Sequence, residues 1–362
     1  MPLEQMPSSY AEPLLSIVVA AYNVDGYVEE ALDSLLAQPY IDAIRIIVVD
    51  DGSTDDTYAA VQTVLERDGG RHIEVVRQRN RGVSAARNAG IAAVRTPYVG
   101  FLDGDDIYLK GFTSVVIPLL AQHRWDMIEY NIRIIDDDNR ELDELELVSA
   151  SESGDCVLNL AAQQRFADAF NTFVWARIFR AELLADMQFP VGRHYEDMAV
   201  VPSIHLAANR AYRISEPLYG YRRRFGSITQ KATLSDMRDL RAIGLEALER
   251  CCGRETDNYW LTVFDKIFRR ACHVCARVDG MSFAEASETL RMIAGDHHTL
   301  VTGLARHGGQ PVAELKPFHL QVRVDRSVHQ VKGIVKKFLR RRLDSYQRER
   351  RATLPGQQET EV

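Results

Sequence analysis

The first part of the chain alternates between two hydrophobic patterns. Residues 14–21 and 44–49 are short, continuous apolar runs rich in β-branched side chains, which are typical of strands buried on both faces. Over residues 28–36, apolar side chains recur instead at helical spacing, and a proline follows. A second helix is predicted from Ser53, because Asp56 three positions later resembles a capping box.

The same alternation continues to residue 102. Residues 73–76 and 98–102 predict two more strands, and residues 84–94 predict an alanine-rich helix between them. Strands and helices that alternate at this pitch indicate a parallel sheet with right-handed crossovers. We therefore expect the doubly wound α/β class.

The pattern changes in the second half of the chain. The acidic stretch 136–146 predicts a solvated loop, and from about residue 158 the periodicity is mostly helical. Proline and glycine make residues 190–230 irregular. Residues 234–300 are helical in pattern, and 301–318 resemble a linker.

The composition is that of an ordinary soluble protein of 362 residues, with 46% hydrophobic and 26% charged side chains. The net charge of -7 argues against a uniformly basic nucleic-acid-binding protein. The charge is unevenly distributed, however. Residues 332–351 hold nine Lys or Arg against two acids, a local charge of +7, which leaves -14 for the remainder.

Two further observations bear on location. The five cysteines are few, odd in number and widely spaced, which suits a reducing compartment. The N-terminus has no secretory pattern, and no window approaches the roughly eighteen apolar residues of a membrane span. We therefore predict a cytoplasmic protein.

Polar side chains gather where the predicted strands end. In an open parallel sheet, ligands bind beyond the carboxyl ends of the strands. Asp50 and Asp51 follow the second strand, while Asp103, Asp105 and Asp106 follow the fourth. Carboxylates crowded together repel one another unless a cation is present, and hard oxygen ligands favour Mg²⁺ or Mn²⁺. The alternative is a surface Asp-Gly-Asp turn that binds nothing.

Two common nucleotide-binding patterns are absent. The turn after the first strand lacks clustered glycines, which argues against a dinucleotide site, and the chain has no P-loop. The acidic residues could instead contact a base and hold a cation that binds a diphosphate. This combination points to a nucleotide-sugar pocket.

Four segments together resemble the family 2 glycosyltransferases of the GT-A fold. They read SIVVAAYNVDGYVEEALDSLLAQ, IIVVDDGSTDDT, NRGVSAARNAGIAAV and YVGFLDGDD. The resemblance implies a Rossmann-like, mostly parallel sheet flanked by helices, with a helical C-terminal extension. It divides the chain into a nucleotide-sugar half (1–125), an acceptor half (126–232), a helical region (233–310) and a linker with a basic tail (311–362).

The resemblance also implies a function and a set of binding residues. The expected enzyme is a hexosyltransferase-type, inverting glycosyltransferase that uses a UDP-sugar or related donor and Mn²⁺ or Mg²⁺. Its acceptor would be a hydroxyl of a bacterial cell-surface glycan or of a lipid-linked acceptor. Asp105 and Asp103 would bind the metal. The nucleotide-binding residues would be Ala20, Tyr22, Asn23, Asp50, Asp51, Arg81, Arg87, Asp103 and Arg222.

An inverting transfer needs a general base on the acceptor side. By resemblance, the pair after the glycine-containing turn 189–195 supplies it, with Asp197 as the base and Glu196 or His194 orienting it or the acceptor. Alternatively, the two acids only complement a helix dipole. Trp175 could stack on an acceptor sugar or simply pack in the core.

Two C-terminal features remain open. Residues 328–351 combine an apolar stripe with basic residues, which is typical of a helix on an anionic membrane, although such a helix could also dock on the acidic body. Cys272 and Cys275 share a helix face, and zinc is the weaker alternative to core packing there. A non-catalytic nucleotide-sugar-binding subunit and a nucleotidyltransferase are the rival functions.

Overall fold

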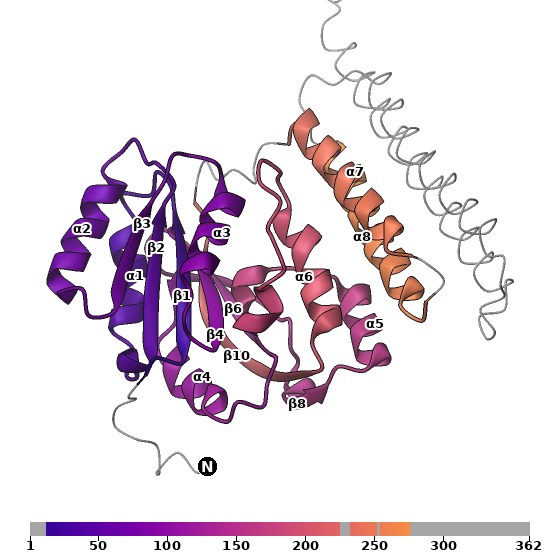
Figure 1. The fold of residues 1–362 in the computed structure, drawn as a ribbon, viewed down its shortest axis with the longest axis horizontal. Coiled ribbons are helices and arrows are strands. Elements are labelled where there is room, and N and C mark those ends of the chain that lie inside the picture. The colour runs from indigo at the N-terminus through magenta and orange to yellow at the C-terminus, as the bar shows by residue number, and fades with distance from the viewer. Residues whose placement is uncertain (1–11, 225–231, 252–253, 276–362) are drawn as a thin grey trace, which may run out of the picture. The chain divides into compact units, whose positions relative to one another are not determined.

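A computed structural model describes residues 12–224, 232–251 and 254–275 (Figure 1). The chain forms two compact units, residues 1–227 and 228–362. The first unit is built on a ten-stranded sheet in which β3-β2-β1-β4-β9-β6-β10-β5 are neighbours, while β7 pairs with β6 and β8 with β10. Strands from both predicted halves, 1–125 and 126–232, thus share one sheet.

The N-terminal strands form the parallel part of the sheet. They are β1 (Leu15–Ala21), β2 (Ile44–Asp50), β3 (Ile73–Arg77) and β4 (Tyr98–Asp103). The first two and the fourth are almost wholly buried, which is why their sequences are continuous apolar runs. The alternating pattern therefore predicted this half correctly.

Three helices connect these strands. Helices α1 (Val28–Leu36) and α2 (Thr57–Asp68) pack against each other, and α3 (Val83–Ala93) packs on β1 and β2 on the other side of the sheet (Figure 1). Helix α3 approaches β1 closely at Gly90, where a β-carbon would lie 2.2 Å from Cγ1 of Val18. A larger residue at position 90 would clash with Val18 unless the helix moved.

The C-terminal half of the sheet is mixed. Its strands are β5 (Ile107–Tyr108), β6 (Met127–Ile135), β7 (Glu141–Leu145), β8 (Gly154–Val157), β9 (Arg177–Arg180) and β10 (Arg210–Arg222). Strand β9 runs antiparallel to both β4 and β6, whereas β6 and β10 are parallel to each other. The α/β class expected from the sequence, with a mostly parallel sheet flanked by helices, is confirmed.

Short helices complete this unit. The α-helices are α4 (Phe112–Leu120), α5 (Leu160–Ala169) and α6 (Glu196–Ala207). The 3-10 helices are η2 (Ile41–Ala43), η3 (Ala150–Glu152), η4 (Val174–Ala176) and η5 (Ala181–Leu184).

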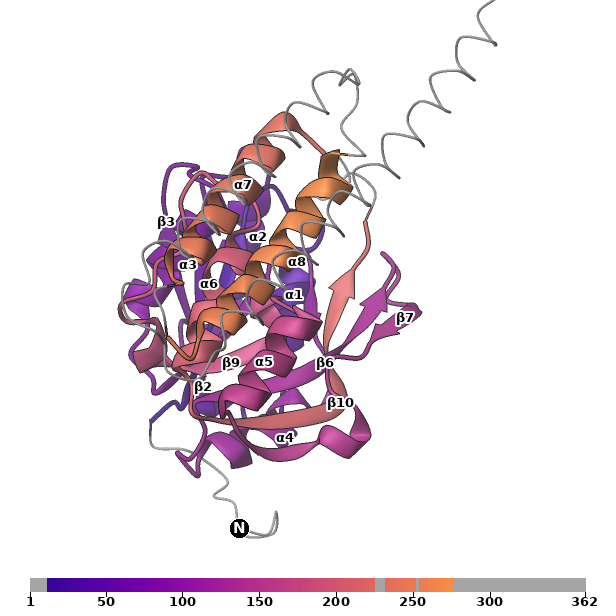
Figure 2. The ribbon, with the colours of Figure 1, turned by 90° about the vertical axis from the view of Figure 1, so that its right-hand side faces the viewer.

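Three local expectations were wrong. Helix α2 begins at Thr57 without a capping box, because the Ser53 amide donates to Oδ1 of Asp50 and the Ser53 hydroxyl accepts from the amide of Asn23. The acidic stretch expected to be a loop contains β7, an exposed edge strand beside β6 (Figure 2). The irregular stretch contains β10, which accommodates Pro217 through shifts in its register with β6.

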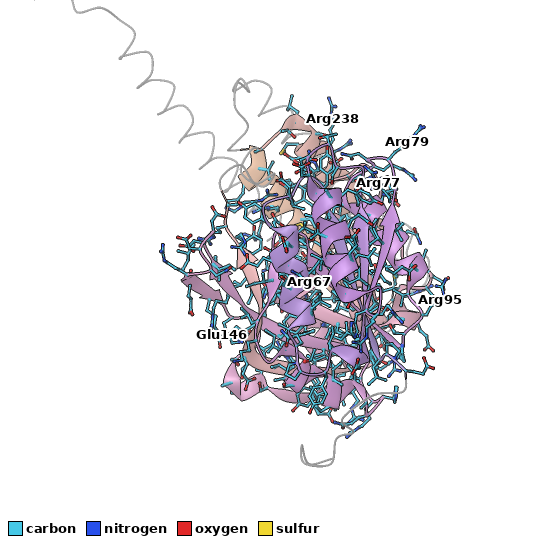
Figure 3. All side chains as sticks on the ribbon, turned by 90° about the vertical axis from the view of Figure 1, so that its left-hand side faces the viewer. Arg67, Arg77, Arg79, Arg95, Glu146 and Arg238 are labelled. Atoms are coloured by element: carbon cyan, nitrogen blue, oxygen red, sulfur yellow. The ribbon has the colours of Figure 1, made fainter. Side chains whose placement is uncertain are left out.

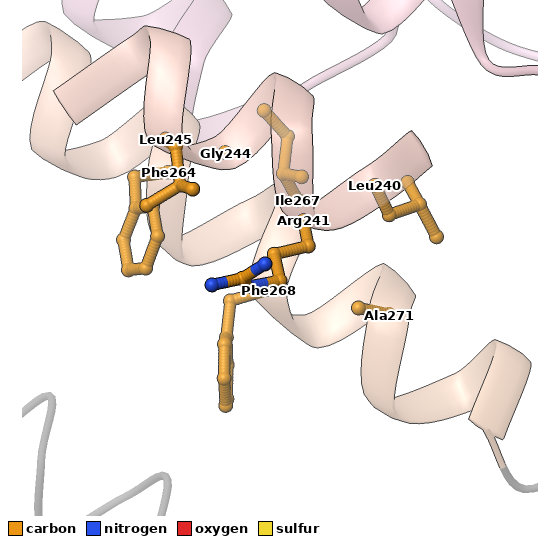
Figure 4. A pocket seen from close by; sticks show the side chains of 8 residues that line it. All are labelled: Leu240, Arg241, Gly244, Leu245, Phe264, Ile267, Phe268 and Ala271. Atoms are coloured by element: carbon orange, nitrogen blue, oxygen red, sulfur yellow. The ribbon is translucent and has the colours of Figure 1, made fainter. Parts of the chain in front are cut away.

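The second unit contains a helical hairpin of α7 (Leu234–Glu249) and α8 (Asp257–Cys275). Helix α7 starts with a capping box between Thr233 and Asp236. A small hollow between the two helices is lined mainly by apolar side chains, among them Leu240, Phe264 and Phe268 (Figure 4). The expected linker and basic tail, and the side chains of Cys252, Cys272 and Cys275, lie outside the described residues.

Among the residues that the structure describes, no helix is long and apolar enough to span a bilayer.

Candidate active site

The first two acids of the Asp-Gly-Asp-Asp turn lie at the carboxyl end of β4. Asp103 is the last residue of the strand, and Gly104 follows with its amide donating to the carbonyl of Ala20 across 2.9 Å. A β-carbon on Gly104 would lie 3.0 Å from that same carbonyl oxygen. Glycine therefore allows the turn to press against the end of β1, which leaves Asp103 and Asp105 both half-buried at this edge.

Arg87 connects this turn to the Glu-Asp pair of α6. Its guanidinium donates through Nη2 to Asp103 (2.8 Å) and through Nη1 to Glu196 (2.5 Å). The side chain is only 4% exposed, and the two carboxylates raise its pKa against the effect of burial. Arg87 is thus a buried cation shared by the two candidate sites.

Asp105 has a different cationic partner. Nε of Arg224, two residues after the end of β10, lies 2.6 Å from Oδ2 of Asp105. Burial and the neighbouring charge of Asp103 nevertheless raise the pKa of Asp105. The sequence pointed to Arg222 in this region and did not single out Arg224.

Asp106 supports the turn from beneath. It is buried, accepts from the Tyr219 hydroxyl (2.8 Å) and from the Arg222 amide (2.7 Å), and burial raises its pKa well above the usual value. The Tyr219 hydroxyl also accepts from the amide of Asp103, at 3.2 Å. Asp106 therefore ties the turn to β10 rather than facing a ligand.

The Glu-Asp pair forms the first turn of α6, after Tyr195 in a left-handed conformation (φ 61°). Asp197 accepts from the amide of Met198 at 2.8 Å and from the hydroxyl of Thr172 at 3.4 Å. Burial and the adjacent Glu196 raise the pKa of Asp197 to about 7, against the opposing charge of Arg87. A carboxylate of this kind can accept a proton near neutral pH.

Asp51 organises the loop on the nucleotide side. Its carboxylate accepts from the amides of Arg81 and Gly82 and from Nε2 of Gln78, at 2.7–3.1 Å, and the residue is 2% exposed. Asp50 is equally enclosed, with Oδ2 accepting from Nε of Arg77. Both aspartates therefore position the backbone of this edge.

Other expected nucleotide residues lie on the same side. The Asn23 side chain accepts from Thr54 and holds the loop after β2. Tyr22 is 42% exposed, and Ala20 is half-buried beside the turn. Arg81 is exposed. Figure 3 shows Arg77 and Arg79, which come just before it in the chain, at the surface of the molecule.

Arg222 was expected to contact the nucleotide, but its side chain is enclosed by the protein. Its side chain is 1% exposed and donates to the carbonyls of Asp105, Asp136 and Asp137 and to the carboxylate of Glu30. The Tyr27 ring lies 5.5 Å from the Arg222 guanidinium and 5.3 Å from that of Arg224. Arg222 therefore holds the DxD turn from inside the protein, and no sequence signal pointed to Tyr27.

The two expected acceptor residues have unlike surroundings. Trp175 is buried and stacks on Tyr219 (4.7 Å between centroids) and Tyr221 (5.4 Å), which favours the packing interpretation. His194 is exposed just before α6. Arg177, two residues after Trp175, is buried and forms an ion pair with Glu129.

The residues at the β4 turn fit a Mg²⁺ or Mn²⁺ ion that is shared with a ligand. Within the described ranges, no group of three or more His, Cys, Asp or Glu side chains forms a closed metal site. Mg²⁺ sites commonly use only one or two carboxylates, with phosphate oxygens and water completing the shell. Asp103 and Asp105 supply that number, and burial together with the nearby charge of Asp103 raises the pKa of Asp105.

Comparison with known proteins identifies related sequences and folds. Residues 16–184 match the family described as "Glycosyl transferase family 2". The uncharacterized glycosyltransferase EpsJ of Bacillus subtilis is 33% identical over 226 residues, which are 60% of this chain and 63% of EpsJ. The succinoglycan biosynthesis protein ExoU of Rhizobium meliloti is 41% identical over 121 residues, 33% of each chain. The chain thus spans less than two thirds of the length of either relative.

The fold is also similar to a solved structure. S. aureus TarS 1-349, crystallised in complex with UDP-GlcNAc, superposes with a TM-score of 0.66 at 20% identity. The superposition covers 93% of this chain and 92% of that one.

Proposed function

Residues 16–184 belong to glycosyl transferase family 2, and we propose that the protein transfers a sugar, with inversion, from a nucleotide-sugar donor to an acceptor hydroxyl. The observation that carries this proposal is the pairing of two carboxylate sites through Arg87. One site is the Asp103–Asp105 turn and the other is the Glu196–Asp197 pair. A transferase needs both a place for the departing diphosphate and a base for the incoming hydroxyl.

The donor is proposed to bind at the carboxyl edge of β1, β2 and β4. Tyr22, Asn23 and the loop held by Asp51 would flank the nucleoside, with Asp50 supporting that loop. Arg81 is close in sequence to this loop and exposed, so it can reach a phosphate. UDP is the first nucleotide to test, since the TarS structure similar in fold holds UDP-GlcNAc.

A divalent cation would be held by Asp105 and Asp103. When bound, Mn²⁺ or Mg²⁺ neutralises charge that develops on the departing diphosphate. The protein's own contribution is to fix the turn, through Gly104, Asp106 and the buried Arg222.

Asp197 is proposed as the general base. Thr172 and the amide of Met198 orient its carboxylate, and its raised pKa suits proton transfer near neutral pH. The acceptor O–H bond breaks as Asp197 takes the proton, and the acceptor oxygen forms the new bond to the anomeric carbon. The bond from that carbon to the diphosphate oxygen breaks, and the nucleoside diphosphate leaves from the opposite face of the sugar. Glu196 remains bound to Arg87 and fixes the start of α6.

The acceptor is proposed to be a growing cell-surface glycan or a lipid-linked acceptor. ExoU, a succinoglycan biosynthesis protein, supports a polysaccharide product. The basic residues of 328–351 support attachment to an anionic membrane surface from the cytoplasmic side. Removing 328–351 should lower the fraction of protein that sediments with anionic liposomes, and an unchanged fraction would favour docking on the acidic body.

A titration of UDP with and without Mn²⁺ tests the donor site. Wild-type protein should bind UDP more tightly with Mn²⁺, whereas Asp105→Asn should lose the difference. Asp143→Asn, on exposed β7, is the matched control and should behave as wild type. If wild-type protein binds UDP with the same heat with and without Mn²⁺, the metal assignment is wrong. If the protein binds UDP but transfers no sugar, the alternative of a non-catalytic subunit is favoured.

A further inference from the structure

Two adjacent residues of α3 hold the two ends of one loop. The side chain of Asn88 bonds twice to the backbone of Phe189, because Nδ2 donates to its carbonyl (2.8 Å) and Oδ1 accepts from its amide (2.9 Å). Arg87 donates to Glu196, at the start of α6. The loop between these contacts, residues 190–195, is therefore fixed at both ends by α3.

The Phe189 end is also anchored by its side chain. The ring is 1% exposed and lies edge-on to Phe101 of β4, with 5.8 Å between the ring centroids. The Arg87 guanidinium lies 5.7 Å from the centroid of the Phe189 ring. A buried amide and carbonyl need hydrogen-bond partners, and the Asn88 side chain supplies one acceptor and one donor to the same residue. Alanine at position 88 would remove both bonds.

The other end of the loop has an unfavourable backbone conformation. Tyr195 has a φ of 61°, in the left-handed region that residues other than glycine rarely adopt. Such a conformation persists only where the surrounding structure imposes it. The carbonyl of Tyr195 accepts from the amide of Met198 at 3.1 Å, in the first turn of α6. The conformation of Tyr195 therefore sets the direction in which Glu196 and Asp197 leave the loop.

We propose that Asn88 is a positioning residue for Asp197, an inference that rests on the function proposed above. Asn88 and Arg87 fix the two ends of the loop, and the fixed ends keep Tyr195 in its left-handed conformation. Asp197 is thereby held where the hydroxyl of Thr172 reaches its carboxylate. Asn88 acts through the loop and not on the substrate.

The surroundings of Asp197 make this role measurable without a substrate. Burial and the charge of Glu196 raise the pKa of Asp197, while Arg87 of α3 and the hydroxyl of Thr172 oppose that rise. If the loop is released at Phe189, the start of α6 can move and water can reach the carboxylate, so its pKa should fall toward the ordinary value. The folded variant would then release a proton that the folded wild type retains up to about pH 7.

Loss of Asn88 should therefore destabilise the protein more at pH 5 than at pH 8. At pH 5 the retained proton on Asp197 stabilises the folded wild type, and Asn88→Ala should lose part of this contribution. The factor by which Asn88→Ala raises the equilibrium constant of unfolding should be about tenfold larger at pH 5 than at pH 8 if the pKa falls by about one unit. A residue that only stabilised the fold would change the constant by the same factor at both pH values.

The experiment is urea unfolding of the full chain at pH 5 and pH 8, for wild type and Asn88→Ala, each with and without Asp197→Asn. In the Asp197→Asn background, Asn88→Ala should have the same effect at both pH values. Asn159→Ala, which removes the side-chain cap of α5, is the control and should also act equally at both. An equal effect of Asn88→Ala at the two pH values, or the same pH dependence in the Asp197→Asn background, would overturn the proposal.

Hydrogen exchange of wild-type protein tests the hold on Phe189 even if Asn88→Ala does not fold. The Phe189 amide should exchange at least about tenfold more slowly than in an unstructured peptide, and an unprotected amide would overturn the proposal.

A titration of UDP at saturating Mn²⁺ separates this inference from the proposed function. Asn88→Ala should bind UDP within about twofold of wild type, and loss of binding in the variant alone would overturn the role of Asn88 in positioning Asp197. No UDP binding by wild type would contradict the proposed function, whereas the urea experiment would still decide whether Asn88 holds Asp197 in place.

Discussion

Arg87 and Glu196 form an ion pair across 109 positions of sequence, with Nη1 2.5 Å from Oε1. The same guanidinium holds Asp103 through its other terminal nitrogen. One buried cation thus fixes α3 against the start of α6 and against the end of β4. The donor-side turn and the proposed base pair are consequently held in one rigid arrangement before any substrate binds.

The pH dependence of transfer should report Asp197. Because its pKa is raised to about 7 and only the deprotonated form can accept a proton, kcat/KM should rise through about pH 7 and level off above it. Well below pH 7, the rate should fall about tenfold per pH unit. A profile measured between pH 5.5 and 8.5 checks this. A flat profile over that range would remove Asp197 from the role of base.

Asp197→Asn should separate binding from chemistry. The amide cannot accept the proton, so kcat should fall by about 10²–10⁴-fold while the affinity for the donor stays the same. Asp168→Asn, exposed on α5, is the control and should keep full activity. Turnover near the wild-type rate in Asp197→Asn would place the base elsewhere.

The same substitution should alter how stability depends on pH. The folded-state pKa of Asp197 lies above its unfolded value of about 3.8, so the folded protein retains a proton that the unfolded chain releases. This group therefore lowers the free energy of unfolding as the pH rises from about 4 to 7. Urea unfolding of Asp197→Asn should show a smaller decline over that interval, and an identical decline would contradict the assigned pKa shift.

Arg222→Lys should destabilise the first unit. Lysine cannot reproduce the planar set of donors that reaches three carbonyls and Glu30. We expect a loss of about 2–4 kcal/mol in the free energy of unfolding, as for other disrupted buried ion networks. Arg223→Lys, at the exposed neighbouring position, should stay within about 0.5 kcal/mol of wild type. Equal stability of the two variants would refute the structural role of Arg222.

Gly90→Ala should test the contact between α3 and β1. Alanine favours helices by about 1 kcal/mol over glycine, but here its β-carbon would meet Val18 at 2.2 Å. The clash should dominate and cost about 1–3 kcal/mol. Gly26→Ala, where a β-carbon would meet nothing within 4 Å, is the control for thermal unfolding. A Gly90→Ala variant as stable as wild type would show that the helix can shift freely.

The sequence predicted those parts of the fold whose burial leaves a local pattern. Strands β1, β2 and β4 are buried on both faces, so their apolar runs are continuous and easily recognised. Strand β10 carries Pro217, which breaks such a pattern. Its register shifts against β6 at that residue, a tertiary accommodation that no local pattern reveals.

The sequence predicted which residues belong to the candidate site better than it predicted which of them are in contact. The sequence predicted that Asp103 and Asp105 follow a strand. It also indicated that Glu196 and Asp197 could stand at the start of a helix. The separate surroundings of Arg222, Arg223 and Arg224 could not be predicted, because they depend on where β10 ends. Arg222, the last residue of the strand, is buried, whereas Arg223, the next residue, is exposed. The bridge made by Arg87 joins residues too distant in sequence for any spacing to indicate it.

The most direct test of the central claim is a thermal-shift panel of nucleotide sugars in the presence of Mn²⁺. A donor at about 100 times its dissociation constant stabilises a protein by about 2.7 kcal/mol, so Tm should rise by several degrees for at least one UDP-sugar. The rise should disappear with EDTA and in Asp105→Asn. An unchanged Tm with every nucleotide sugar and Mn²⁺ would contradict the proposal that this protein is a metal-dependent glycosyltransferase.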